Sequence, residues 1–127
     1  MDTIQELQLP YLEEYKDFIM NYKSGQVNGE QVGEVIARLA QYFSEFNNRL
    51  VNAERALFIV AKDIEMREDE RTGKPITSTK ATVIVSATDE HYIVEILKAH
   101  VENIEQFINA LKALQKGVLN EHSYAGL

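Results

Sequence analysis

An uninterrupted heptad pattern of apolar residues between Val32 and Ile64 constrains the fold more than any other feature of this sequence. Ten consecutive pattern positions, alternately four and three residues apart, all carry apolar side chains. Because two heptad positions recur every 3.5 residues on average, this spacing keeps one stripe of a helix facing a neighbouring helix. This first seam consists of Val32, Ile36, Leu39, Phe43, Phe46, Leu50, Ala53, Leu57, Val60 and Ile64.

A second seam with the same spacing lies in the last third of the chain. It is flanked by a further row at intervals of seven residues, which includes His100 and Phe107. A stripe that wide favours a helical bundle over a two-stranded coiled coil. The second seam consists of Val94, Leu97, Val101, Ile104, Ile108 and Leu111 and continues through Gln115 and Val118.

These patterns predict an all-α fold in which long helices form a helical hairpin or bundle. Pro10 suits the first position of a short N-terminal helix, and Asn28 with Gln31 suits a capping box before the long helix. Thr88, followed by two acids, suits the start of the last helix. We expect a single helical domain at residues 1–127, with helices at about 10–23, 29–70 and 89–120 and a connector at 71–88.

The connector contains a helix break and an ambiguous segment. Gly73 and Pro75 end the long helix. Residues 83–85, Val-Ile-Val between threonines, suit a short strand, whereas Ser78 is a suitable N-cap for a short helix. The sequence favours a short helix or an extended connector here.

Apolar residues outside the two seams indicate self-association. Val35, Tyr42, Val51, Phe58 and Ile59 form further apolar rows on the long helix. One antiparallel neighbour cannot cover a helix that is apolar on several sides. We therefore expect the chain to form a homo-oligomer.

The charge is unevenly distributed along the chain. The net charge is −7, which disfavours indiscriminate binding to nucleic acids or anionic membranes by the whole surface. Residues 1–48 carry eight acids and three bases, whereas residues 49–80 carry six acids and seven bases. No apolar stretch is long enough to span a bilayer, the N-terminus lacks the pattern of a secretory signal, and cysteine is absent. We expect a cytoplasmic protein with no membrane association.

The sequence offers no constellation typical of catalysis or of metal binding. The three histidines are not spaced as a ligand pair, and neither a nucleophile elbow nor a glycine-rich phosphate loop is present. We expect no enzymatic activity, no catalytic residues, no metal and no cofactor.

A basic cluster around the helix break is the remaining functional signal. Repeated in an oligomer, it would form a positive surface that follows a phosphate backbone. The alternative is a set of solvent-exposed ion pairs, because acidic residues such as Asp63 and Asp69 lie between the bases. The cluster consists of Lys62, Arg67, Arg71, Lys74 and Lys80.

Residues 49–118 resemble UvsY-type phage recombination mediators. The likeness lies in the order of a mixed-charge helix (NAERALFIVAKDIEMRE), a polar break (RTGKP), the segment TKATVIVSATDEHY and a long apolar helix that ends near LQKGVL. The resemblance implies a helical, ring-forming protein that binds single-stranded DNA, contacts a single-strand-binding protein and helps a RecA-like recombinase to load. Lys62 occupies a place comparable to the family's basic residues, with Arg67 near it. The neighbouring acids and the acidic N-terminal third depart from the family.

Three functional hypotheses follow. The first is a non-enzymatic phage-type recombination or replication accessory factor that binds single-stranded DNA and protein partners. The second is a structural, scaffold or adaptor protein of a virion-related assembly that acts only through helix packing. A third, weaker hypothesis is a helical protein that holds a small anionic ligand between subunits.

Overall fold

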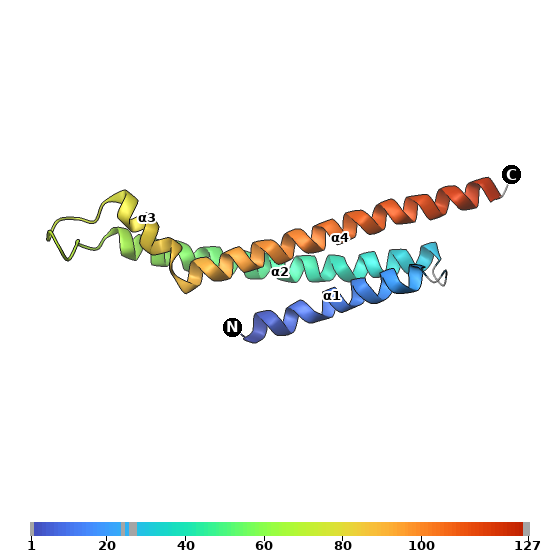
Figure 1. Cartoon of the computed structure of the whole chain (residues 1–127), viewed down its shortest axis with the longest axis horizontal. Coiled ribbons are helices and arrows are strands. Elements are labelled where there is room, and N and C mark those ends of the chain that lie inside the picture. Colours follow the sequence, from blue (N-terminus) through green and yellow to red (C-terminus); the bar gives the residue numbers. More distant parts are fainter. Residues whose placement is uncertain (1, 24, 26–27, 126–127) are drawn as a thin grey trace. The chain divides into compact units, whose positions relative to one another are not determined.

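The computed structural model confirms the all-α fold. It describes residues 2–23, 25 and 28–125, with side chains at 10–23, 25 and 28–117. The described part of the chain forms four helices and no strand. In chain order they are α1 (Asp2–Lys23), α2 (Gly29–Glu65), α3 (Ser78–Ser86) and α4 (Asp89–Ala125) (Figure 1).

The chain divides into two compact units within the single domain expected at 1–127. Unit 1 comprises Met1–Glu45 and His100–Leu127, and unit 2 comprises Phe46–Ala99. Helices α2 and α4 each contribute residues to both units. The basic cluster lies entirely in unit 2.

Aromatic contacts hold together the three helical segments of unit 1. The Tyr11 ring of α1 lies 6.4 Å from the Tyr42 ring of α2 and 6.1 Å from the Phe107 ring of α4. Tyr15 stacks on Phe107 with ring centroids 3.9 Å apart and ring planes 4° apart. Such pairs stabilise a core beyond the area that they bury. α1 therefore packs against both other segments of this unit.

The two seams face partly inward and partly outward. Leu39 and Ile104 are fully buried in unit 1, and Phe46 and Val94 are buried in unit 2. The buried seam positions are Val32, Leu39, Phe46, Ile64, Val94, Leu97, Ile104 and Leu111. The half-buried seam positions are Ile36, Phe43, Leu50, Ala53, Leu57, Val60, Val101, Ile108 and Gln115. Val118 lies outside the side chains that the structure describes.

The additional apolar rows have different environments. Val35 is buried and Tyr42 is half-buried, both in unit 1. Val51, Phe58 and Ile59, in contrast, are 65%, 61% and 62% exposed. The neighbours of α2 within the chain thus leave three large apolar side chains of this helix in solvent.

The first helix begins earlier than the sequence predicts. α1 starts at Asp2, so Pro10 lies inside the helix and not at its first position. A proline inside a helix lacks the N–H that would bond the preceding turn, and here the helix continues despite that loss. The cap of α2 is confirmed: the Asn28 side chain accepts from the Gln31 N–H and the Gln31 side chain accepts from the Asn28 N–H, both at 3.0 Å.

The connector contains a short helix. α2 ends at Glu65, earlier than the expected boundary near residue 70, and α3 follows at Ser78–Ser86. The N-cap of α3 is Thr77 and not Ser78, because the Thr77 hydroxyl accepts from the Lys80 N–H at 3.2 Å. Thr88 caps α4, as expected, by accepting from the His91 N–H at 3.2 Å.

His100 is a buried polar residue in the core of unit 1. Its side chain is mostly shielded, with only 7% of the residue exposed, and its Nδ1 lies 2.6 Å from the Tyr11 hydroxyl. The hydroxyl donates when Nδ1 is unprotonated. Burial lowers the pKa of His100 from its ordinary value of 6.5, because the charged imidazolium loses its hydration.

We predict that His100 makes stability depend on pH. The unfolded chain takes up the imidazole proton at a higher pH than the folded chain does. The contribution of neutral His100 is therefore present above pH 6.5 and is lost as the pH falls toward the lowered pKa. Denaturant unfolding at pH 8 and pH 5.5 should show a steeper loss in the wild type than in His100→Gln, by up to about 1.4 kcal/mol per pH unit.

Ile104→Val is the matched control, because Ile104 is fully buried in the same helix and carries no titratable group. It should lower the stability by the same amount at both pH values. Identical slopes for His100→Gln and the wild type would contradict the prediction.

Candidate nucleic-acid interface

The loop between α2 and α3 carries most of the basic cluster and is held by its own backbone. The Ile76 N–H donates to the Arg67 carbonyl at 3.0 Å, and the Asp69 N–H donates to the Lys74 carbonyl at 2.7 Å. The Gly73 N–H donates to the Asp69 carbonyl at 2.7 Å, and Gly73 has a φ of +66° that suits glycine. Residues 66–77 therefore fold back on themselves as a defined loop (Figure 1).

Asp69 connects this loop to α3. Its carboxylate accepts from Lys80 Nζ at 2.8 Å and from the Arg71 N–H at 2.9 Å. The hydrogen bond from Lys80, followed by that from the Arg71 backbone, holds the pKa of the Asp69 carboxyl below its usual range. The pairing of Lys80 with Asp69 orients the loop and neutralises one of the predicted cations.

Three of the five predicted site residues have carboxylate partners. Lys80 pairs with Asp69, and Arg67 Nη2 lies 2.8 Å from Asp63. Lys62 Nζ lies 3.5 Å from Glu65 in a looser pair. The pairs of Arg67 and Lys62 are exposed on both sides and such pairs are weak, so a ligand with a higher charge density can displace their carboxylates.

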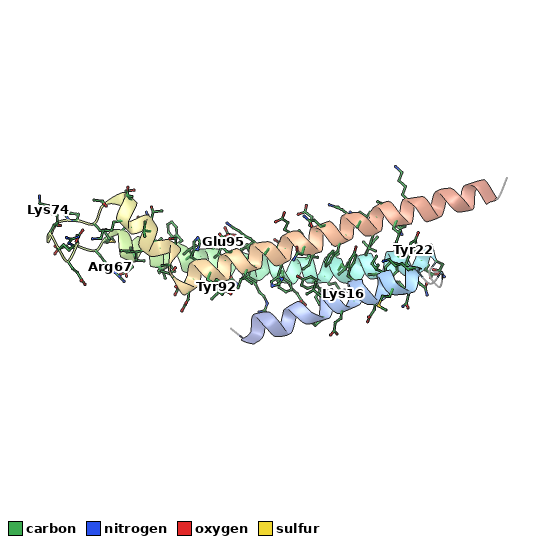
Figure 2. All side chains as sticks on the ribbon, in the orientation of Figure 1. Lys16, Tyr22, Arg67, Lys74, Tyr92 and Glu95 are labelled. Atoms are coloured by element: carbon green, nitrogen blue, oxygen red, sulfur yellow. The ribbon has the colours of Figure 1, made fainter. Side chains whose placement is uncertain are left out.

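Arg71 and Lys74 differ from the other three. Both side chains are exposed, and no carboxylate lies within ion-pair distance of either among the described residues. Figure 2 shows Lys74 at the tip of the loop. These two cations are the ones whose charge the protein leaves available.

A hollow of about 420 Å³ brings three of the predicted residues together. Arg67, Arg71 and Lys80 line it, over an apolar base formed by Ile76 and Ile84. Lys62 and Lys74 do not line this hollow. Its remaining lining residues are Glu68, Asp69 and Glu70. The hollow offers guanidinium and ammonium donors to an anion, but its three acids balance its three cations.

One contact beside Lys62 was not predicted from the sequence. Its Nζ lies 5.4 Å from the centroid of the Phe58 ring, a cation–π distance. Phe58 was predicted to belong to an apolar row that other copies of the chain would cover, and within the single chain it is 61% exposed. The sequence contains one signal for this contact. Arg55 and Lys62 lie three and four residues from Phe58, on the same side of the helix.

Unit 1 carries a second candidate surface, which is apolar. Ile36 and Phe43 of α2 and Ile108 of α4 line a groove of about 310 Å³. Glu105 and Lys112, seven residues apart on α4, border it. Neither has an ion-pair partner in the part of the chain that the structure describes.

The described residues contain neither a metal-binding group nor a membrane-spanning helix. They contain no group of three or more histidines, cysteines, aspartates or glutamates placed to hold a metal ion. His91 lies 3.9 Å from Glu95 on α4, and His100 bonds Tyr11. None of the described helices has the length and apolarity needed to cross a bilayer.

Comparison of the chain with models of known protein families, with curated proteins and with solved structures finds no match.

Proposed function

We propose that this protein is a non-enzymatic, self-associating helical factor that binds single-stranded DNA. Its role would be that of an accessory protein in phage-type recombination or replication, in which it assists the loading of a RecA-like recombinase. It would act in the cytoplasm and contact a single-strand-binding protein. DNA phosphates would bind to the basic cluster, and contacts between copies would repeat that cluster.

The observation that carries the DNA-binding proposal is the pair of unpartnered cations on an ordered loop. Backbone hydrogen bonds and the Asp69 carboxylate fix the loop, so Arg71 and Lys74 project without losing their charge to a neighbour. Phosphates are the groups that such exposed cations bind most readily, and binding releases counterions. The resemblance to UvsY-type mediators supports the same interpretation, because Lys62, with Arg67 near it, occupies a place comparable to the family's basic residues late in the helix before the break.

The groove of unit 1 supports self-association. Its half-buried apolar residues remain accessible, and its bordering charges are complementary under two-fold symmetry. An antiparallel copy centred between Ile108 and Asn109 places Glu105 of one chain beside Lys112 of the other, and the reverse. Such reciprocal pairing is characteristic of an isologous interface.

A structural assembly protein is the second candidate function. The ion pairs of Arg67, Lys80 and Lys62 favour it, because they leave the basic cluster with less net charge than its sequence implies. Such a protein would associate with itself or with other proteins through helix packing and would have no affinity for DNA.

The DNA-binding proposal predicts a specific salt dependence. Arg71→Glu/Lys74→Glu should weaken binding to a fluorescein-labelled oligo-dT and lower the slope of log K against log salt by about one unit per lost phosphate contact. Fluorescence anisotropy at several salt concentrations measures both quantities.

The matched control is Lys16→Glu/Lys23→Glu, which changes the net charge equally at exposed positions of α1. This control should retain most of the affinity and the slope. Absence of binding by the wild type, even at low ionic strength, would exclude the DNA-binding function and favour the structural candidate.

The self-association proposal predicts a charge-swap result. Multi-angle light scattering should give the wild type a mass above the 14.5 kDa of one chain. Lys112→Glu should lower that mass by placing like charges opposite each other, and Glu105→Lys/Lys112→Glu should restore it. A wild type that remains monomeric at high concentration would contradict self-association, and a swap that fails to restore the mass would exclude this groove.

A further inference from the structure

The seams of unit 1 place their residues in two alternating environments. On α2, Val32 and Leu39 are fully buried, whereas Ile36 and Phe43 are half-buried and line the apolar groove. The same alternation on α4 gives the buried Ile104 and Leu111 and the half-buried Ile108. The rings that Tyr11 of α1 contacts on α2 and α4 do not line the groove, so these contacts of α1 lie outside it. Helices with two such rows require a neighbour for each row, as in a four-helix bundle.

One close approach shows which residues of α2 and α4 are level with each other in unit 1. A methyl group added to Gly33 of α2 would lie 3.3 Å from Nε2 of Gln115 on α4. The two helices run antiparallel (Figure 1), so each step forward along α2 corresponds to one step back along α4. The residues that line the groove agree with this alignment. The level pairs among them are Ile36 with Lys112 and Phe43 with Glu105.

This alignment makes the two halves of the groove complementary to each other. The midpoint between Ile36 and Phe43 is level with the midpoint between the two charged residues of α4. A two-fold axis at this level that pairs Glu105 with Lys112 of a second chain therefore also places Ile36 of one chain beside Phe43 of the other. Ala40 lies within one residue of the axis, where its small side chain lets two helices approach to about 8 Å.

Charge and symmetry together identify a second copy as the occupant of the groove. Both charged residues that line it, Glu105 and Lys112, belong to α4, and α2 contributes none. The same axis brings Glu102 of one chain within one residue of the level of Lys116 of the other, and both residues are exposed. An unrelated protein would need a matching surface of its own, whereas a second copy supplies the opposite charges and the apolar residues at once.

We propose that unit 1 pairs with unit 1 of a second copy through an antiparallel four-helix interface, in which α2 packs on α2, α4 packs on α4 and Ala40 lies beside the two-fold axis. The half-buried row of each seam becomes buried in this interface. The inference rests on the proposed self-association and extends it, because it assigns α2 to the interface and fixes the register of the two chains. Each dimer then carries two copies of the basic cluster.

A single cysteine at Ala40 tests this register, because the chain has no cysteine of its own. The two copies of residue 40 are one residue apart along the helix axis, about 1.5 Å, so their Cβ atoms fall within the reach of a disulfide. Ala40→Cys in the full-length protein should form a covalent dimer under mild oxidation about tenfold faster than Ala37→Cys does. Non-reducing gel electrophoresis measures the dimer fraction over time, and circular dichroism verifies that both variants fold.

Ala37→Cys is the matched control, because Ala37 is an exposed alanine of the same helix that does not line the groove. Its two copies would be five residues apart along the helix axis, about 7.5 Å, which exceeds the distance between Cβ atoms in a disulfide. This variant should crosslink only at the slow rate of random collision.

Light scattering and crosslinking together separate this inference from the proposed self-association. A wild type that remains monomeric at high concentration would overturn both. A wild type that assembles, together with an Ala40→Cys variant that crosslinks no faster than Ala37→Cys, would overturn the register and leave self-association intact. Selective crosslinking of Ala40→Cys, with a wild-type mass of at least two chains, would support the four-helix interface.

Discussion

Helix-to-helix burial is the constraint on which the rest of this structure depends. A helix shields its apolar side chains only where another helix lies against it, and both seams satisfy part of this requirement inside the chain. In unit 1, α1 adds aromatic contacts to the segments of α2 and α4, and Tyr11 is fully buried there. In unit 2, Ile64 and Val94 are buried while Phe58 remains in solvent. The surfaces available for function are those that this partial burial leaves uncovered.

The two candidate surfaces on unit 2 differ in how they present positive charge. On the loop, backbone hydrogen bonds and Asp69 fix the geometry, and the cations without carboxylates are Arg71 and Lys74 among the described residues. On α2, the regular helix fixes the geometry, and Lys62 lies 5.4 Å from the centroid of the Phe58 ring. The loop presents cations without an aromatic neighbour, whereas Lys62 presents its charge beside an aromatic surface.

Much of the fold follows from local sequence signals, and the departures have physical reasons. The cap formed by Asn28 and Gln31 was predictable because both partners lie within four residues of each other. The end of α2 was not predictable, because residues 66–70 are compatible with a helix. In the structure their backbone groups bond to residues 74–76 instead of continuing the helix. The basic cluster was predictable as a set. Its division into paired and unpaired cations depends on contacts such as Lys80 with Asp69, eleven residues apart, which spacing alone does not reveal.

The position of Lys62 over Phe58 has a consequence for whatever packs on this part of α2. In the free protein the ammonium already lies over the ring, so a partner that covers Phe58 would exchange one favourable contact for another. The net gain is the difference between two attractions, so it is smaller than the gain on a bare phenyl ring.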